Sequence, residues 1–326
     1  MRNFLALTER ELKAYFVSPM AYIILGFFVL ATGLFFLYII TAFDRASMMA
    51  MMQAQQYGRM PALNVNLHAL RPLFHNIAII ALFLLPGVTM RAFAEEKRQG
   101  TIEFLLTSPL SNWQITLAKF ASAALFYLAM LAATAFFISL LFLYGSPELK
   151  PLLTGYLGLF LTGACFIAWG LFFSAFTENQ IIAFIATLAS LLVLLFMSWF
   201  EEYAGPTLGK IITGLSPITH FDDFSKGVID SKHVVFYLSF IFAMLFLTYV
   251  KLESERWRGF QGRRIQVALP TTIAALAKTF GKTVDAILEK GRSFGLTSAE
   301  QTIADKNAAI ELAFQFGYDA EVSTKQ

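Results

Sequence analysis

The sequence predicts an all-α polytopic membrane protein, and three observations lead to this fold class. Of the 326 residues, 57% are apolar, including 35 phenylalanines, and the mean hydropathy is +0.62. Only 14% of the residues are charged, whereas soluble domains carry about a quarter. The charges also avoid long stretches of the chain, which a soluble core does not require.

Six runs without a charged residue are long enough to cross a hydrocarbon core about 30 Å thick. A backbone in hydrocarbon must satisfy its own hydrogen bonds, so we expect helices. The runs lack the alternation of a membrane β-barrel. The predicted spans are residues 20–42, 73–90, 120–144, 152–176, 181–200 and 234–250.

The distribution of lysine and arginine predicts that both termini lie in the cytoplasm. With this orientation the basic residues concentrate in the cytoplasmic segments, as is usual for membrane proteins. The outer loops are longer and carry fewer of them. The predicted cytoplasmic charges are Arg2, Arg10, Lys13, Arg91, Lys97, Arg98, Lys119, Lys251, Arg256, Arg258, Arg263 and Arg264.

Residues 1–18 combine charges with apolar residues at roughly helical spacing, and Pro19 then opens the first span. This pattern predicts an amphipathic helix at the membrane surface. The alternative is an ordinary charged flank.

The segment 91–116 is a charged insert between two apolar runs. Gly100 interrupts it, and Thr101 is placed to cap a short amphipathic helix over 102–107. Such a helix fits a groove on a partner protein; the alternative is a polar elbow between two spans. The charged, helix-breaking and capping residues of this pattern are Glu95, Glu96, Gly100, Thr101, Glu103 and Pro109.

The segment 201–232 precedes the sixth span and is either a hairpin that re-enters the membrane from outside or a polar outer loop. His220, Asp222, Asp223 and His233 have the side chains of metal ligands, but their spacing matches no tight site, so we predict no metal. The end of this segment contains His220, Phe221, Asp222, Gly227 and Asp230.

No motif predicts catalysis. A phosphate loop ending at Lys282-Thr283 would need glycine at position 276, where Leu276 stands. The spans hold almost no ionisable groups, which argues against an ion-coupled carrier. The net charge of +3 does not favour nucleic acid, and the single Cys165 excludes an intrachain disulfide.

The tail, residues 252–326, changes in composition and contains no run long enough to span a bilayer. Helix-forming residues over 271–289 and 298–316, separated by glycines, predict a small cytoplasmic helical extension.

Four segments resemble the membrane subunits of type-2 ABC exporters, and most closely the gliding-motility-associated permease group. They begin at residues 9, 86, 172 and 220, and together the resemblance covers residues 1–255. The segments read ERELKAYFVSPMAYII, PGVTMRAFAEEKRQGTIEFLLTSPLSNWQITLAKF, FFSAFTENQIIAF and HFDDFSKGVIDSKH.

This resemblance implies a transmembrane subunit of an ATP-driven exporter in the bacterial inner membrane, with unknown cargo. It implies a second permease, identical or related, and two separate ATPase subunits that bind ATP and magnesium, so this chain is not itself an enzyme. The helix over 1–18 and the loop over 91–116 would touch the ATPase, within a six-helix domain over 19–251. The resemblance makes Glu95, Glu96, Gly100, Thr101, Glu103 and Pro109 the candidate partner-coupling residues. It makes His220, Phe221, Asp222, Gly227 and Asp230 the candidate residues of the outer hairpin. The alternative is a motility scaffold that uses the same fold without moving a solute.

Overall fold

The computed structural model describes the chain in segments that fall into two units, Met1–Leu252 and Glu253–Gln326. The described residues are 2–57, 64–102, 110–144, 147–197, 214–258, 263–269, 271–280, 283–291, 302–303, 312 and 318–324.

In the first unit the described elements are helical, as predicted, and five helices are long and apolar enough to cross a membrane. These are α2 (Pro19–Tyr57), α3 (Arg71–Thr89), which continues the short π-helix η1 (Asn66–Leu70), α6 (Asn112–Tyr144), α7 (Leu149–Ser174) and α11 (Ser231–Arg258). The predicted fifth span corresponds to α8 (Gln180–Met197), whose apolar stretch is shorter than those of the five. Five spans are therefore supported by length, and the sixth stays a prediction.

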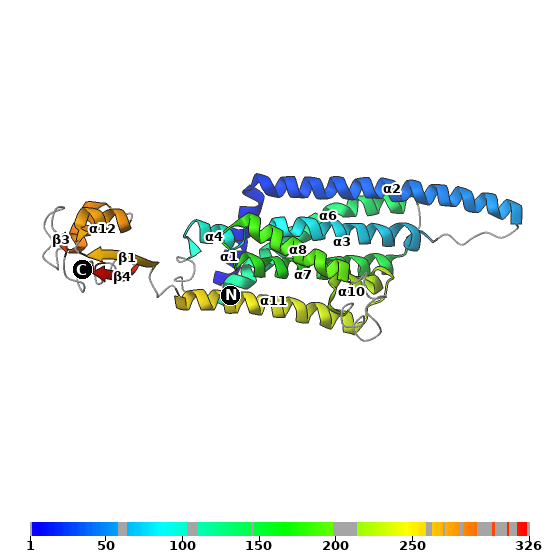
Figure 1. The fold of residues 1–326 in the computed structure, drawn as a ribbon. Helices are drawn as coiled ribbons and strands as arrows, with labels where there is room; N and C mark the ends of the chain where they lie inside the picture. The colour runs from blue at the N-terminus through cyan, green and yellow to red at the C-terminus, as the bar shows by residue number, and fades with distance from the viewer. Residues whose placement is uncertain are drawn as a thin grey trace. The chain divides into compact units, whose positions relative to one another are not determined.

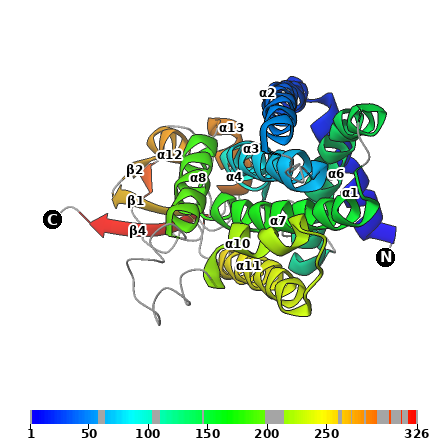
Figure 2. The same ribbon diagram turned by 90° about the vertical axis from the view of Figure 1, so that its right-hand side faces the viewer.

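The helices α3 and α7 form the centre of this unit, and α2 and α11 lie on either side of them (Figure 2). In the most hydrophobic part of α3 and α7, 72% and 67% of the residues are buried, against 28% and 22% in α2 and α11. Apolar side chains left exposed on outer helices are what a lipid solvent permits. Most of the buried contacts of the long helices therefore involve α3 and α7. The helices α2 and α11 present apolar surface to lipid or to another subunit.

Glycines let the neighbours of α7 approach closely. A Cβ built on Gly163 would lie 2.1 Å from the ring of Tyr127 on α6, and one on Gly155 would lie 2.1 Å from Phe74 on α3. These glycines therefore serve both close helix contact and internal packing, because the rings of adjacent helices fill the space of the missing side chains.

The first helix, α1 (Arg2–Val17), ends where the chain turns at Ser18. Pro19 has no backbone N–H and disfavours helical geometry in the residue before it, which favours the break between the two helices at this point. Figure 1 shows α1 and the short α4 (Ala94–Arg98) at one end of the helix bundle and α10 (Pro217–Ser225) at the other.

The helix of the first span is longer than predicted. The sequence placed the end of the first span at residue 42, but α2 continues to Tyr57 through a methionine-rich stretch. Between residues 43 and 57 there is no glycine or proline, and alanine, methionine and glutamine favour helix. The charges Asp44 and Arg45 end the apolar run without ending the helix.

The predicted hairpin over 201–232 is only partly described, because residues 198–213 lie outside the described part. The described part contains α10, which packs on α7 and α3 with Phe221 and Phe224 buried. Tyr237 of α11 donates its hydroxyl hydrogen to the carbonyl of Pro217 over 2.7 Å. The structure thus places a helix here, and re-entry into the membrane stays a prediction.

The tail is not wholly helical, so that part of the prediction is wrong. The helix-prone segment over 271–289 forms α12 (Ile273–Phe280) and α13 (Val284–Gly291). Strand β1 (Arg263–Leu269) pairs in parallel with β4 (Tyr318–Thr324), and β2 (Thr271–Thr272) pairs antiparallel with β3 (Thr302–Ile303). Ile265, Val267 and Leu269 alternate along β1, a period-two pattern that indicates a strand.

Candidate functional site

The predicted partner-coupling segment lies beside the N-terminal helix, at the end of the bundle where α3 ends and α6 begins (Figure 1). Glu95 and Glu96 fall in the first turn of α4, and Lys97 and Arg98 in its last turn. This order of charges complements the helix dipole. Gly100 and Thr101 follow directly. Glu103 and Pro109, and most of the predicted helix over 102–107, lie outside the described residues.

The start of α4 is fixed to the end of α7 by one hydroxyl group. The backbone N–H groups of Phe93 and Ala94 donate to Oγ of Ser174 over 3.1 and 3.2 Å, and this hydroxyl donates to the carbonyl of Met90 over 3.1 Å. Lys97 adds a bond to the carbonyl of Ala175. A helix of five residues is not stable alone, so these tertiary bonds hold α4 in place.

The end of α4 explains why glycine stands at position 100. Gly100 has φ of +69°, in the left-handed region that other residues rarely adopt. Its N–H bonds the carbonyl of Lys97 over 3.1 Å, and the N–H of Thr101 bonds the carbonyl of Glu96 over 2.9 Å. Together these two bonds form a Schellman motif. The motif ends the helix and sets the direction in which the chain leaves toward residues 102–109.

Lys119 of α6 joins α1 to α4. Its Nζ lies 3.1 Å from Oε2 of Glu11 on α1 and 2.8 Å from Oε1 of Glu96 on α4. The lysine side chain is only 3% exposed, and its ammonium also lies over the ring of Phe93, 5.4 Å from the centroid. A buried cation requires such partners, because desolvating it alone is very unfavourable. One charge therefore connects both segments predicted to touch the ATPase.

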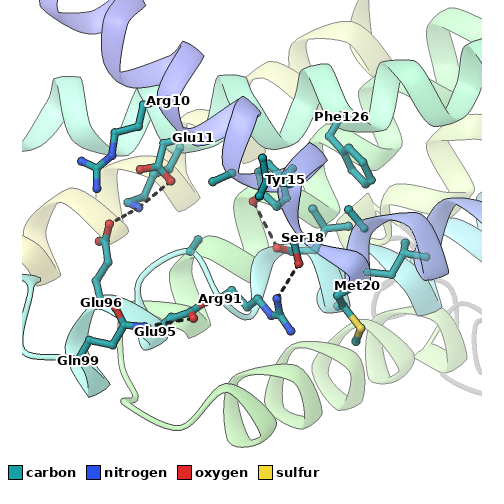
Figure 3. A pocket seen from close by; sticks show the side chains of 18 of the residues that line it. Arg10, Glu11, Tyr15, Ser18, Met20, Arg91, Glu95, Glu96, Gln99 and Phe126 are labelled. Carbon is teal, nitrogen blue, oxygen red and sulfur yellow. Dashed lines mark hydrogen bonds and ion pairs between the residues drawn. The ribbon is translucent and has the colours of Figure 1, made fainter.

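Further contacts seat α1 against the bundle. The ring of Tyr15 stacks on Phe126 of α6 at 5.4 Å, and its hydroxyl donates to the carbonyl of Val88 over 3.3 Å. Burial raises the pKa of Tyr15 above its usual value, so this hydroxyl stays protonated and remains a donor. Figure 3 shows the side chain of Arg91 directed at Ser18, where Nη1 donates to Oγ over 3.1 Å.

At the opposite end, charged groups connect α10 to α3. Asp222 accepts a hydrogen bond from Arg71, lies 3.6 Å from Nε2 of His75, and pairs with Lys226, the residue that follows α10. Phe221 is buried beneath this cluster.

Two of the predicted hairpin residues determine how the chain leaves α10. Gly227 has a positive φ of 91° beside Pro151, and Asp230 caps α11 by accepting the N–H of Lys232 over 2.9 Å.

The two histidines near α10 bond to each other. Nδ1 of His220 lies 2.6 Å from Nδ1 of His233, whose Nε2 lies 2.9 Å from Oδ2 of Asp223. Nε2 of His220 lies 3.1 Å from the carbonyl of Gly214. The hydrogen bond from His233 lowers the pKa of Asp223 below its usual value. These contacts engage all four ring nitrogens, so the histidines tie α10 to α11.

We expect Asp222→Asn to reduce the free energy of unfolding by about 1 kcal/mol at neutral pH. A hydrogen bond to a charged group is worth about 1.5–3 kcal/mol, and solvent screening at this partly exposed site lowers that value. Burial raises the pKa of Asp222, but the hydrogen bonds from Lys226 and Arg71 outweigh it and leave the pKa below its usual value. The carboxylate therefore stabilises the fold above about pH 4, and this contribution disappears as the pH falls through the lowered pKa.

Thermal unfolding of the detergent-purified protein at neutral and acidic pH measures this effect. Asp44→Asn is the control, since Asp44 is exposed on α2. A stability difference between wild type and Asp222→Asn that did not shrink in acid would contradict the assignment.

Comparison with known proteins identifies the membrane unit. Residues 55–250 match the family described as ABC-2 family transporter protein. The chain belongs to this family. The permease is also similar to the "Probable multidrug ABC transporter permease YbhR" of Escherichia coli K12 and of E. coli O157:H7, with 29% identity over 154 residues. That stretch covers 47% of this chain and 41% of each relative, so the chain spans about two fifths of the length of the curated relatives it matches.

The prediction of an ABC-2 permease is thus confirmed, whereas the gliding-motility subgroup stays a prediction. Sequence reasoning missed the two residues that organise this end of the permease, Lys119 and Ser174. The sequence does distinguish Lys119, because it is the only charged residue in the long apolar helix from Asn112 to Tyr144. Ser174 resembles any small polar residue at a helix end, and nothing in its sequence context distinguishes it.

Proposed function

We propose that the permease is the membrane subunit of an ATP-driven exporter and that ATPase subunits dock on α4, on the segment that follows it and on α1. The proposal rests on the two ion pairs of Lys119, which join α1 and α4 to α6. A push on either surface element would then reach a membrane helix through a single buried cation. Ser174 and Lys97 extend the same connection to α7.

The finer features of this proposal come from the resemblance. Two ATPase subunits bind ATP and magnesium and hydrolyse the nucleotide, while this chain pairs with a second permease, identical or related. The complex lies in the bacterial inner membrane with both termini of the chain in the cytoplasm, and the chain crosses the membrane six times. The four quoted segments support assignment to the gliding-motility group. The name of the relative, a probable multidrug permease, supports drug-like compounds as the cargo.

Two substitutions at the proposed docking surface are expected to reduce co-purification of the ATPase at least tenfold, while the spans still insert. Glu95→Lys reverses a charge on α4, and like charges across an interface cost several kcal/mol. Gly100→Pro imposes φ near −65° where the structure has +69°, which redirects the chain after α4. The measurement is the amount of ATPase retained by a tagged permease after purification from membranes.

Glu148→Lys is the matched control, because it makes the same charge reversal at an exposed residue next to the start of α7. Normal ATPase retention by both docking variants would exclude α4 as the contact. ATPase stimulation by a transported compound in liposomes then separates an exporter from a scaffold, which would bind the ATPase without such stimulation.

A further inference from the structure

Two cavities meet beneath α1. The first, about 540 Å³, lies among α1, α4 and the adjoining ends of α2, α3 and α6 (Figure 3). The second, about 400 Å³, lies between α2, α3 and α8. Met20, Ile24 and Gly87 line both cavities. Each has the volume of a small-molecule site, and together they form a slot that is charged at one end and apolar at the other.

The apolar cavity opens on the outside of the helix bundle. All of its lining residues are apolar, and Ile23, Phe27, Phe83 and Ile181 among them are substantially exposed. They belong to α2, α3 and α8, and α2 is among the least buried of the long helices. A hydrocarbon chain in the surrounding bilayer can therefore enter from the side and lie along this wall.

The charged cavity has two unused hydrogen-bonding atoms of opposite kind. Among the described residues, Nε of Arg91 and Oε2 of Glu96 are buried and have no hydrogen-bond partner. Both residues line the cavity. Arg91 already uses Nη1 for Ser18, and Glu96 uses Oε1 for Lys119. The site thus offers one free donor and one free acceptor, and buried polar groups left unsatisfied are unfavourable.

The formal charges of the charged cavity balance. It is lined by three bases and three acids, which are Arg10, Arg91, Lys119, Glu11, Glu95 and Glu96. A purely anionic head would meet the three carboxylates, and a purely cationic one the three bases. A head that carries both charges satisfies the free donor and the free acceptor and adds no net charge to a partly buried site.

We propose that the two cavities together bind one zwitterionic phospholipid of the phosphatidylethanolamine type. Its phosphate accepts from Nε of Arg91, its ammonium donates to Glu96, and one acyl chain lies in the apolar cavity between α2, α3 and α8. The lipid then occupies the junction of α1 and α4 with the membrane helices. This lipid site is independent of the ATPase proposal, because it requires only the isolated permease.

The test uses the full chain purified in detergent and titrated with phosphatidylethanolamine or phosphatidylglycerol of identical acyl chains, with native mass spectrometry to count bound lipid. The wild type should prefer phosphatidylethanolamine. Arg91→Gln should weaken binding of both lipids about tenfold, because it removes the phosphate donor. Glu96→Gln should weaken only phosphatidylethanolamine to that extent, because phosphatidylglycerol has no ammonium group.

Glu9→Gln is the control, since Glu9 is exposed on α1 and does not line the cavity. Gly87→Leu keeps all charges and fills the junction of the two cavities, where a Cβ would lie 3.6 Å from Ile24. It should weaken both lipids about tenfold, and it tests the proposal if either charge variant fails to fold. Equal binding of the two lipids by the wild type, or unchanged binding in folded variants, would overturn the proposal.

A second copy of the chain is the competing occupant of the apolar cavity. The only native cysteine, Cys165, is buried, so Ile23→Cys provides a single reactive thiol. We expect a short bifunctional thiol crosslinker to form no crosslink between two copies through this position. Efficient crosslinking of two copies through this position would mean that protein, and not lipid, covers the cavity.

Discussion

Lys119→Met is expected to lower the free energy of unfolding by about 3–5 kcal/mol, the typical cost of removing one partner from a buried ion pair. The ammonium of Lys119 is shared by Glu11 and Glu96, whose side chains are 17% and 19% exposed. Without it, two poorly solvated carboxylates face the same site with no cation between them. Equilibrium unfolding of the detergent-purified permease, followed by helical circular dichroism, measures the loss.

Two comparisons make this prediction specific. Lys13→Met removes the exposed pair with Glu9, whose side chains are 72% and 66% exposed, and should cost less than about 1 kcal/mol. Adding Glu11→Gln and Glu96→Gln to Lys119→Met should recover much of the lost stability, because a charge-free cluster has no unpaired ion to desolvate. A triple variant no more stable than Lys119→Met would show that packing, and not charge, is what Lys119 contributes.

The same substitution also bears on function. If α1 and α4 transmit ATPase movement through Lys119, the triple variant regains stability but not the link between the two elements. We expect it to retain the ATPase and to lose cargo-dependent stimulation of ATP hydrolysis. Stability and coupling are thus separated in one set of proteins.

The membrane helices were predictable because hydrocarbon imposes a simple rule on composition. All five long helices and α8 overlap the predicted spans. Their ends were less predictable, since a helix continues beyond the hydrocarbon wherever propensity allows. In α2 the apolar run stops near Asp44, yet helix-forming residues extend it to Tyr57.

The tail shows a different cause of error. The prediction of a helical tail overlooked strand β1, in which Ile265, Val267 and Leu269 alternate, and whose partner β4 lies about 50 residues further along the chain. A parallel pairing of such separation leaves no local turn signal, and a strand without a visible partner is easily overlooked. Helix propensity in the intervening segment correctly indicated α12 and α13 but not the strands beside them.

At the candidate site, the sequence predicted local features such as a helix end, but not the contacts between distant segments. The glycine at position 100 marked the end of a helix, and its positive φ gives the reason. The link from Glu96 through Lys119 to Glu11 joins residues that lie 23 and 108 positions apart. No pattern in a single sequence pairs charges over such distances, so this connection emerged only from the fold.

Gly163→Ala is expected to destabilise the permease by about 1–3 kcal/mol, the usual cost of overpacking a core, although alanine is the better helix former. A Cβ at this position would lie 2.1 Å from Cε1 of Tyr127, well inside van der Waals contact. The ring cannot simply move away, because Tyr127 is fully buried and its hydroxyl donates to the carbonyl of Leu159 over 3.0 Å. Either α6 and α7 separate or this buried hydrogen bond breaks.

Gly26→Ala on α2 is the matched control, since it is the same change on another apolar helix, with no atom within 4 Å of the new Cβ. It should be neutral or stabilising by up to about 1 kcal/mol, from helix propensity alone. Tyr127→Leu removes the clashing ring, so Gly163→Ala should cost much less in that background, and the double-mutant cycle gives the coupling of the pair. If Gly163→Ala and Gly26→Ala had equal effects, the close approach of α6 to α7 would have no energetic consequence, and glycine at this position would need another explanation.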